Sequence, residues 1–160
     1  MLDIKLDEKD IGILRILQEN SKISSKDIAK RIGSPIPTIY AKIKRMEDLG
    51  IIKNYKAVLD AKKLGKGTTA FILISFEYRP SGTEKPLDQR EIAKKIAKFP
   101  EVQELYVITG DWDILIKVKA KDVDDVGKFV LDKLRKIEGI EKTLSCMVYD
   151  VIKESSDISL

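Results

Sequence analysis

The N-terminal third of the chain repeats apolar residues at helical spacing and predicts three helices in close succession. Asp7 is placed to cap the first helix, whose inward stripe includes Ile13 and Leu17. Ser24 is placed to cap the second helix, and Gly33 is placed to end it in a left-handed conformation. This part of the chain is therefore predicted to be an all-helical unit.

The third predicted helix begins within "SPIPTIY", where two prolines stand close together. We expect Ser34 to cap this helix, with Pro35 and Pro37 in its first turn. Backbone amides in a first turn have no intrahelical acceptor, so neither proline removes a hydrogen bond. Helical spacing then turns Ile39 and Met46 toward the protein.

The opposite face of this third helix is polar and basic. It carries Pro37, Thr38, Ala41, Lys44 and Arg45, flanked by Tyr40 and Lys42. Two short helices joined by a tight turn, the second of them basic and exposed, are typical of a helix-turn-helix, whose second helix can enter the major groove of DNA. Residues 20–56 carry a net charge of +6, whereas residues 61–160 carry only +1. A plain three-helix core with a solvated basic face is the alternative.

The rest of the chain alternates strand-like and helix-like segments in the order βαββαβ, which is typical of a ferredoxin-like domain in an α+β protein. Strands are predicted over residues 68–78, 102–110, 112–120 and 141–153, and helices over 88–99 and 122–137. We expect the buried side of the second helix to include Val123 and Leu131.

The first of these strands holds a continuous apolar run, Ala70–Ile74, which indicates that both faces of the sheet are covered. The two helices of the unit can cover only one face. We therefore expect a second copy of the domain on the other face, as in an isologous dimer. The alternatives are that the sheet merely has a slightly apolar edge, or that the N-terminal unit folds back onto this face.

The composition excludes several kinds of site. The chain has no His and a single cysteine, Cys146, so imidazole or thiolate metal centres and an internal disulfide are excluded. No apolar run is long enough to span a membrane, and the charged N-terminus is unlike a secretory signal, which favours a cytoplasmic location.

The same composition argues against catalysis. There is no histidine base and no phosphate-binding glycine loop, and we expect Cys146 to be an inert, buried core residue within an apolar strand. We predict that the chain is not an enzyme and needs no cofactor. An enzyme of amino-acid metabolism with a ferredoxin-like regulatory domain is the competing hypothesis.

Four segments together resemble the Lrp/AsnC (feast/famine) family of prokaryotic transcription regulators. They are "LDEKDIGILRIL", "SSKDIAKRIGSPIPTIYAKIKRMEDLGIIKNYKAVLD", "FPEVQELYVITGDWDILIKVKA" and "IEGIEKTLSCMVYDVI". The high charge with few amides is typical of thermophiles and favours an archaeal source. The resemblance implies a winged helix-turn-helix domain over residues 1–52, a linker over 53–67 and a ferredoxin-like domain over 68–160.

The resemblance also implies functions for individual residues. DNA contacts would come from Ser34, Thr38, Tyr40, Lys42, Lys44 and Arg45. The C-terminal domain would dimerise, assemble further into octamers or similar rings, and bind an amino-acid effector near Gly110, Asp111, Asp113, Thr143 and Ser145. The connection Arg79–Arg90 is longer than is usual in the family. An architectural DNA-binding protein of the same fold without an effector is the alternative.

Overall fold

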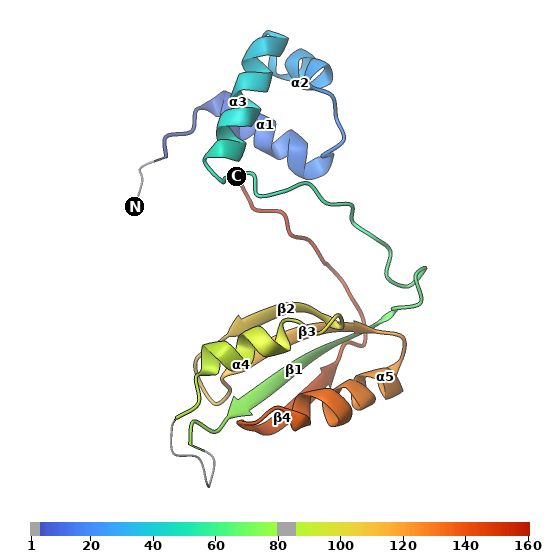
Figure 1. Cartoon of the computed structure of the whole chain (residues 1–160). Helices are drawn as coiled ribbons and strands as arrows, with labels where there is room; N and C mark the ends of the chain where they lie inside the picture. The colour runs from blue at the N-terminus through green and yellow to red at the C-terminus, as the bar shows by residue number, and fades with distance from the viewer. Residues whose placement is uncertain (1–3, 80–85) are drawn as a thin grey trace. The chain divides into compact units, whose positions relative to one another are not determined.

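The computed structural model describes residues 4–79 and 86–160, and the chain divides into two compact units (Figure 1). The helical unit comprises the chain up to Val58 together with Glu154–Leu160, and the sheet unit comprises Leu59–Lys153. The tail, expected in the sheet domain, therefore groups with the helical unit. Among the described residues, no helix is long and apolar enough to cross a bilayer.

The helical unit contains three helices, α1 (Glu8–Glu19), α2 (Ser25–Ile32) and α3 (Ile36–Asp48). Their apolar stripes meet in one core. The fully or nearly fully buried members of this core are Ile13, Leu14, Ile28, Ala29, Ile39 and Met46. The helical periodicity read from the sequence is confirmed, since each helix turns its predicted stripe inward.

The ends of α1 and α2 follow the predicted capping residues. The Asp7 carboxylate accepts a hydrogen bond from the Asp10 amide at 2.8 Å, and the Asp10 carboxylate accepts one from the Asp7 amide at 3.0 Å. This is a reciprocal capping box. Ser24 caps α2 by accepting from the Asp27 amide, and Gly33 ends that helix with φ 69°.

The predicted cap of α3 is wrong. Pro35 occupies the capping position, with φ −60° and ψ 143°, and no side chain caps this helix. The Ser34 amide donates instead to the carbonyl of Ala29 at 3.1 Å, so Ser34 belongs to the end of α2. Its hydroxyl is buried and has no hydrogen-bond partner among the described residues.

The segment after α3 is anchored to that helix. The amides of Ile51 and Ile52 both donate to the carbonyl of Met46, at 2.9 and 3.1 Å. The Tyr55 hydroxyl donates to the Glu47 carboxylate at 2.7 Å. Between α3 and the first strand of the sheet unit, the described residues form no strand. The wing that the resemblance implies after the helix-turn-helix is therefore not a β-strand in the described part of the chain.

The tail docks on α1 through polar contacts. The Gln18 side chain donates to the carbonyl of Ile158 at 3.0 Å and accepts from the amide of the same residue at 2.7 Å. Arg15 donates to the carbonyl of Leu160. These contacts explain why the tail belongs to the helical unit.

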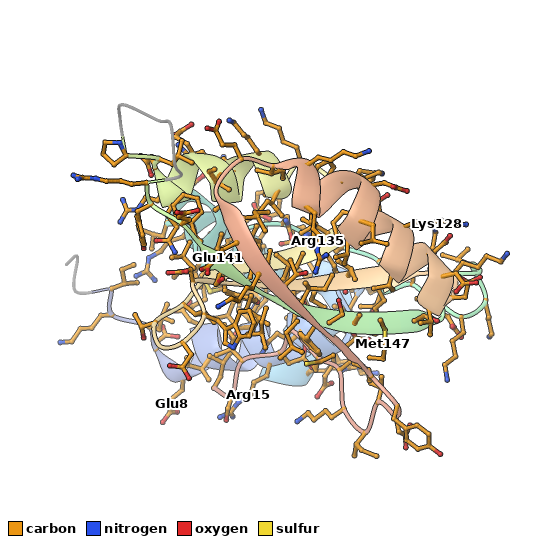
Figure 2. The ribbon with its side chains drawn as sticks, turned by 90° about the horizontal axis from the view of Figure 1, so that it is seen from below. Glu8, Arg15, Lys128, Arg135, Glu141 and Met147 are labelled. Atoms are coloured by element: carbon orange, nitrogen blue, oxygen red, sulfur yellow. The ribbon has the colours of Figure 1, made fainter. Side chains whose placement is uncertain are left out.

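The described residues of the sheet unit form four antiparallel strands in the order β2-β3-β1-β4 and two helical segments. Its elements are β1 (Thr68–Phe76), α4 (Gln89–Ile96), β2 (Val102–Val107), β3 (Ile114–Ala120), α5 (Val123–Lys128) and β4 (Ile140–Met147). Both helices lie on one side of the sheet (Figure 1). Figure 2 shows the β4 edge of the sheet, from Glu141 to Met147, with the helical layer on one side. The predicted βαββαβ order is confirmed.

The second helical segment is less regular than predicted. After α5 the chain makes a π-helical turn, Phe129–Lys133, and a 3-10 turn, Leu134–Lys136. Phe129 is buried while Leu131 is exposed. Phe129 follows the buried Val126 by three residues and shares its helix face, whereas Leu131 follows it by five residues and does not. Val123, at the first position of α5, is also exposed. Both residues were wrongly expected in the buried stripe.

The face of the sheet opposite the helices carries several apolar side chains. Ala70, Ile72 and Ile74 belong to the helix-covered core, so Phe71 and Leu73, which alternate with them, point to the other face. Their partners across the sheet, Lys117 and Leu115 on β3 and Cys146 and Leu144 on β4, share that face. Cys146 is exposed there, which corrects its expected burial.

Candidate nucleic-acid interface

The face of α3 that points away from the core is mostly exposed. Pro37, Thr38, Ala41, Lys42 and Arg45 line a shallow depression on it. Tyr40 is 63% exposed, and Lys44 is exposed with no ion-pair partner in the described part of the chain. Of the six predicted DNA contacts, Thr38, Tyr40, Lys44 and Arg45 therefore lie on an accessible surface.

Lys42 and Arg45 are held by carboxylates of α1. The Lys42 ammonium lies 2.6 Å from an Asp7 oxygen and 2.9 Å from an Asp10 oxygen. The Arg45 guanidinium lies 3.4 Å from the other Asp10 oxygen and donates to the Lys5 carbonyl at 3.0 Å. Only 1% of the Asp10 side chain is exposed, so its charge is compensated by these two cations. Lys42 thus differs from the exposed DNA contact that the resemblance implied, since its side chain is only 18% exposed.

The same contacts change the ionisation of the partners. The hydrogen bond from Lys42, followed by that from the Asp10 amide, lowers the pKa of Asp7 from 3.8 to about 2. The hydrogen bond to Asp7 raises the pKa of Lys42. The pair is therefore ionised across the physiological range. The stabilisation from Asp7 is present above the unfolded pKa near 3.8 and is lost as the pH falls through about 2.

A second groove lies on the other flank of α3. It is lined by Leu17, Ser21, Ile23, Ser25, Tyr40, Ile43, Lys44, Glu47, Asp48 and Tyr55. Burial, followed by the hydrogen bond to the Glu47 carboxylate, raises the pKa of Tyr55 to about 12. This contact fixes the segment after α3 against the end of the helix.

This raised pKa predicts a late step in a spectroscopic titration. The contact is favourable below the unfolded pKa near 10 and is lost as the pH rises through about 12, because the phenolate repels Glu47. Phenolate absorbance should therefore show a step near pH 12 that is absent in Tyr55→Phe and moves toward 10 in Glu47→Gln. An unchanged profile in both variants would contradict the contact.

The predicted effector residues fall into two groups. Gly110 and Asp111 lie in the exposed loop between β2 and β3, where Gly110 has φ 121°. Asp113 ends this loop, and its carboxylate accepts from the Phe76 amide at 2.8 Å and from the Tyr78 hydroxyl at 3.4 Å. Asp113 is therefore occupied in joining β3 to the end of β1, while Asp111 is exposed to solvent.

Thr143 and Ser145 lie on the edge strand β4, on the helix-covered side. Thr143 pairs with Ile74 of β1, and Ser145 pairs with Ile72 of β1. Asp113 contacts β1 along its other edge, the one that pairs with β3, since the Asp113 amide donates to the Ile74 carbonyl at 3.0 Å. Within one sheet unit, β1 thus separates the two groups of predicted effector residues.

Two family models match the two parts of the chain. Residues 6–53 match a winged helix-turn-helix DNA-binding domain, and residues 69–158 match the Lrp/AsnC ligand binding domain. The chain belongs to the Lrp/AsnC family of transcriptional regulators. The α+β class and the order of the two domains are confirmed.

Relatives of this Lrp/AsnC protein match over nearly their whole length. An uncharacterised HTH-type transcriptional regulator of Pyrococcus abyssi is 39% identical over 149 residues, which are 93% of this chain and 96% of the relative. HTH-type transcriptional regulator FL11 of Pyrococcus furiosus is 36% identical over 153 residues, covering 96% and 95%. The archaeal character expected from the composition agrees with these relatives.

Solved structures show the same arrangement of each domain. A transcriptional regulator of Neisseria meningitidis, in complex with L-Met, has a TM-score of 0.88 at 28% identity and covers 97% of both chains. AsnC of Escherichia coli has a TM-score of 0.84 at 26% identity and covers 96% of this chain and 99% of its own. The neighbour from Neisseria meningitidis is thus a transcriptional regulator whose structure contains an amino acid.

Sequence reasoning missed the part that Asp7 and Asp10 have in this Lrp/AsnC protein. Asp7 was recognised only as a helix cap, and Asp10 was not singled out. The available signal was the matching spacing of two acids three residues apart on α1 and two cations, Lys42 and Arg45, three residues apart on α3. Side chains at that spacing share one helix face, so the two pairs can meet where the helices pack.

Proposed function

We propose that this regulator binds duplex DNA with α3 as its recognition helix. The exposed contacts would be Thr38, Tyr40, Lys44 and Arg45, with Lys42 contributing only when its ion pair with Asp7 opens. Ser34 would act by shaping the turn before α3, because its side chain is only 9% exposed. The regulator would act in the cytoplasm, where the DNA is.

A single observation supports this proposal most strongly. Ile39 and Met46 of α3 are fully buried, whereas Thr38, Tyr40 and Lys44 on the same helix are exposed. The helix is therefore held firmly along one side and offers the other side to a partner. Polar and basic side chains on a projecting helix suit the base edges and phosphates of a major groove.

Replacing Lys44 with Ala is expected to weaken DNA binding. If Lys44 neutralises one phosphate, its loss should reduce the salt slope of log K by roughly 0.9 and the affinity by roughly eightfold near 0.1 M salt. Fluorescence anisotropy with a labelled duplex at several salt concentrations measures both. Lys98→Ala, which removes the same charge from an exposed site in the sheet unit, is the matched control. Equal effects of the two substitutions would contradict the assignment of α3.

The sheet unit is proposed to bind an amino-acid effector. Asp111, exposed next to Gly110, would accept the ligand's ammonium, and the hydroxyls of Thr143 and Ser145 would receive its carboxylate. Because β1 separates these groups within one unit, we propose that a neighbouring copy completes the site. The L-Met complex of the Neisseria meningitidis regulator supports an amino acid as the ligand class.

The open face of the sheet is proposed to hold the second copy. Phe71, Leu73 and Leu144 lie on this face, and Leu144 is 46% exposed. An isologous dimer would cover them, and further assembly into an octamer or a similar ring would bring several recognition helices to DNA. In a dimer, two such helices would lie about 34 Å apart, in successive major grooves. By linkage, a ligand that shifts assembly also shifts DNA affinity.

Calorimetric titration with the twenty amino acids tests the effector part of this proposal. We expect at least one to bind, to change the sedimentation of the protein and to change its DNA affinity. Asp111→Ala should abolish this binding, whereas Asp124→Ala, at an exposed acid of α5, should leave it intact. DNA binding that responds to none of the twenty would favour an architectural protein without an effector.

A further inference from the structure

The most densely charged contact in the helical unit joins α1 to α3. Two carboxylates, Asp7 and Asp10, face two cations, Lys42 and Arg45, with the Lys42 ammonium 2.6 and 2.9 Å from one oxygen of each acid. We call these four residues the acidic clamp. The cations belong to the face of α3 that carries the proposed DNA contacts, so the clamp lies at the DNA-binding surface itself.

The acids of the clamp cannot easily turn away. Each carboxylate also accepts the backbone amide of the other residue, at 2.8 and 3.0 Å, in the capping box of α1. The partial positive charge at the start of a helix further favours carboxylates at this end. The capping box of α1 thus fixes the positions of the two carboxylates, and the side chains of Lys42 and Arg45 extend from α3 to reach them.

The two acids differ in exposure, and this gives them different roles. Asp10 is 1% exposed and compensated by both cations, so it anchors α3 to α1. The Asp7 side chain is 59% exposed, and Lys42 is its only cationic partner among the described residues. A phosphate approaching Lys42 would therefore meet the Asp7 carboxylate at the same place. The phosphate would have to replace that carboxylate as the partner of Lys42.

We propose that Asp7 is a specificity-determining residue that suppresses sequence-independent binding to DNA. Non-specific affinity comes almost entirely from phosphates neutralised by Lys and Arg. The clamp withholds Lys42 from this general attraction because its ammonium is already paired. The cation becomes available only in a complex whose other contacts favour opening the Asp7 pair. Asp10 is the positioning residue that keeps α3 and Arg45 in register with α1.

This inference rests on the proposed DNA binding by α3, and Asp7→Asn tests it. Asn is as good a helix cap as Asp, so the substitution preserves α1 and removes the negative charge facing Lys42. Affinity for a labelled duplex of random sequence should rise roughly three- to tenfold near 0.1 M salt, and the salt slope should steepen by roughly 0.9, the value for one phosphate. A role in folding alone would not steepen the slope.

Two further variants make the test decisive. Glu19→Gln removes the same charge from an exposed position on α1 with no ion pair in the described part of the chain, so it measures the general effect of net charge, which salt screens. In the double variant, Lys42→Met should cancel the gain of Asp7→Asn, because the cation that a phosphate would meet is then missing.

The possible outcomes separate the clamp from the wider proposal. A gain in Asp7→Asn that is cancelled by Lys42→Met supports the clamp. If Asp7→Asn behaves like Glu19→Gln while the unmodified protein binds the duplex, the clamp is overturned and DNA binding stands. If no variant binds the duplex at low salt, both proposals fall.

Discussion

Replacing Ile39 with Ala is expected to unfold the helical unit while the sheet unit stays folded. Ile39 is fully buried where α3 meets α1 and α2, and truncating a buried Ile costs about 2–5 kcal/mol. A unit of this size has a small core and correspondingly little stability to lose. DNA binding should therefore disappear even though Ile39 lies on the face of α3 away from the DNA.

Two optical signals separate the units in this experiment. Trp112, the only tryptophan, belongs to the sheet unit, so its fluorescence reports on that unit alone. Helical circular dichroism should fall in Ile39→Ala while the Trp112 unfolding midpoint stays in place. Ile36→Ala, at a position of the same helix that is 47% exposed, is the control and should bind DNA almost normally. A loss of both signals together would show that the units do not fold independently.

Replacing Gly139 with Ala should destabilise the sheet unit by about 2–5 kcal/mol. Gly139 has φ 90°, a conformation that costs other residues about 1–2 kcal/mol. An added Cβ would also lie 2.5 Å from Cε2 of Phe76 and 2.8 Å from Cδ1 of Leu87, and overpacking of this kind costs about 1–3 kcal/mol. The Gly139 carbonyl, which accepts from the Glu77 amide at 2.8 Å, would shift as well.

Gly127→Ala is the matched control for this prediction. Gly127 lies within α5, and a Cβ there meets nothing within 4 Å. Alanine is the better helix former, so this variant should be as stable as the natural chain or more stable by up to about 1 kcal/mol. Denaturant unfolding followed by Trp112 fluorescence compares the two. Equal unfolding midpoints for Gly139→Ala and Gly127→Ala would contradict the close contacts of Gly139 with Phe76 and Leu87.

Local signals in the sequence predicted much of the fold correctly. The caps Asp7 and Ser24 and the left-handed Gly33 depend only on nearby backbone, so short patterns identify them. The Ser34 cap failed because Pro35, which has the extended backbone that a cap requires, occupies the capping position, so Ser34 lies one residue too early and closes the end of α2. The π turn after α5 also escaped prediction, since a helical pattern read at one constant period cannot show a local widening.

The candidate site was predictable only in part. The exposed side of α3 follows from helical spacing, which correctly separated Ile39 and Met46 from Thr38 and Lys44. The ion pairing of Lys42 does not follow from helical spacing, because the partners Asp7 and Asp10 lie more than thirty residues earlier in the chain. Whether a surface cation is free for DNA is decided by packing between helices, which no local pattern contains.

Tethered cleavage from Thr38 tests the account most directly. A DNA-cleaving reagent attached to Thr38→Cys, with Cys146→Ser to remove the native thiol, should cut a bound duplex at short sites about one helical turn apart if α3 enters the major groove as proposed. The same reagent attached to Lys98→Cys of the sheet unit should not produce that cleavage pattern. A duplex that is bound but uncut from Thr38, or cut equally from both positions, would contradict the assignment of α3 as the recognition helix.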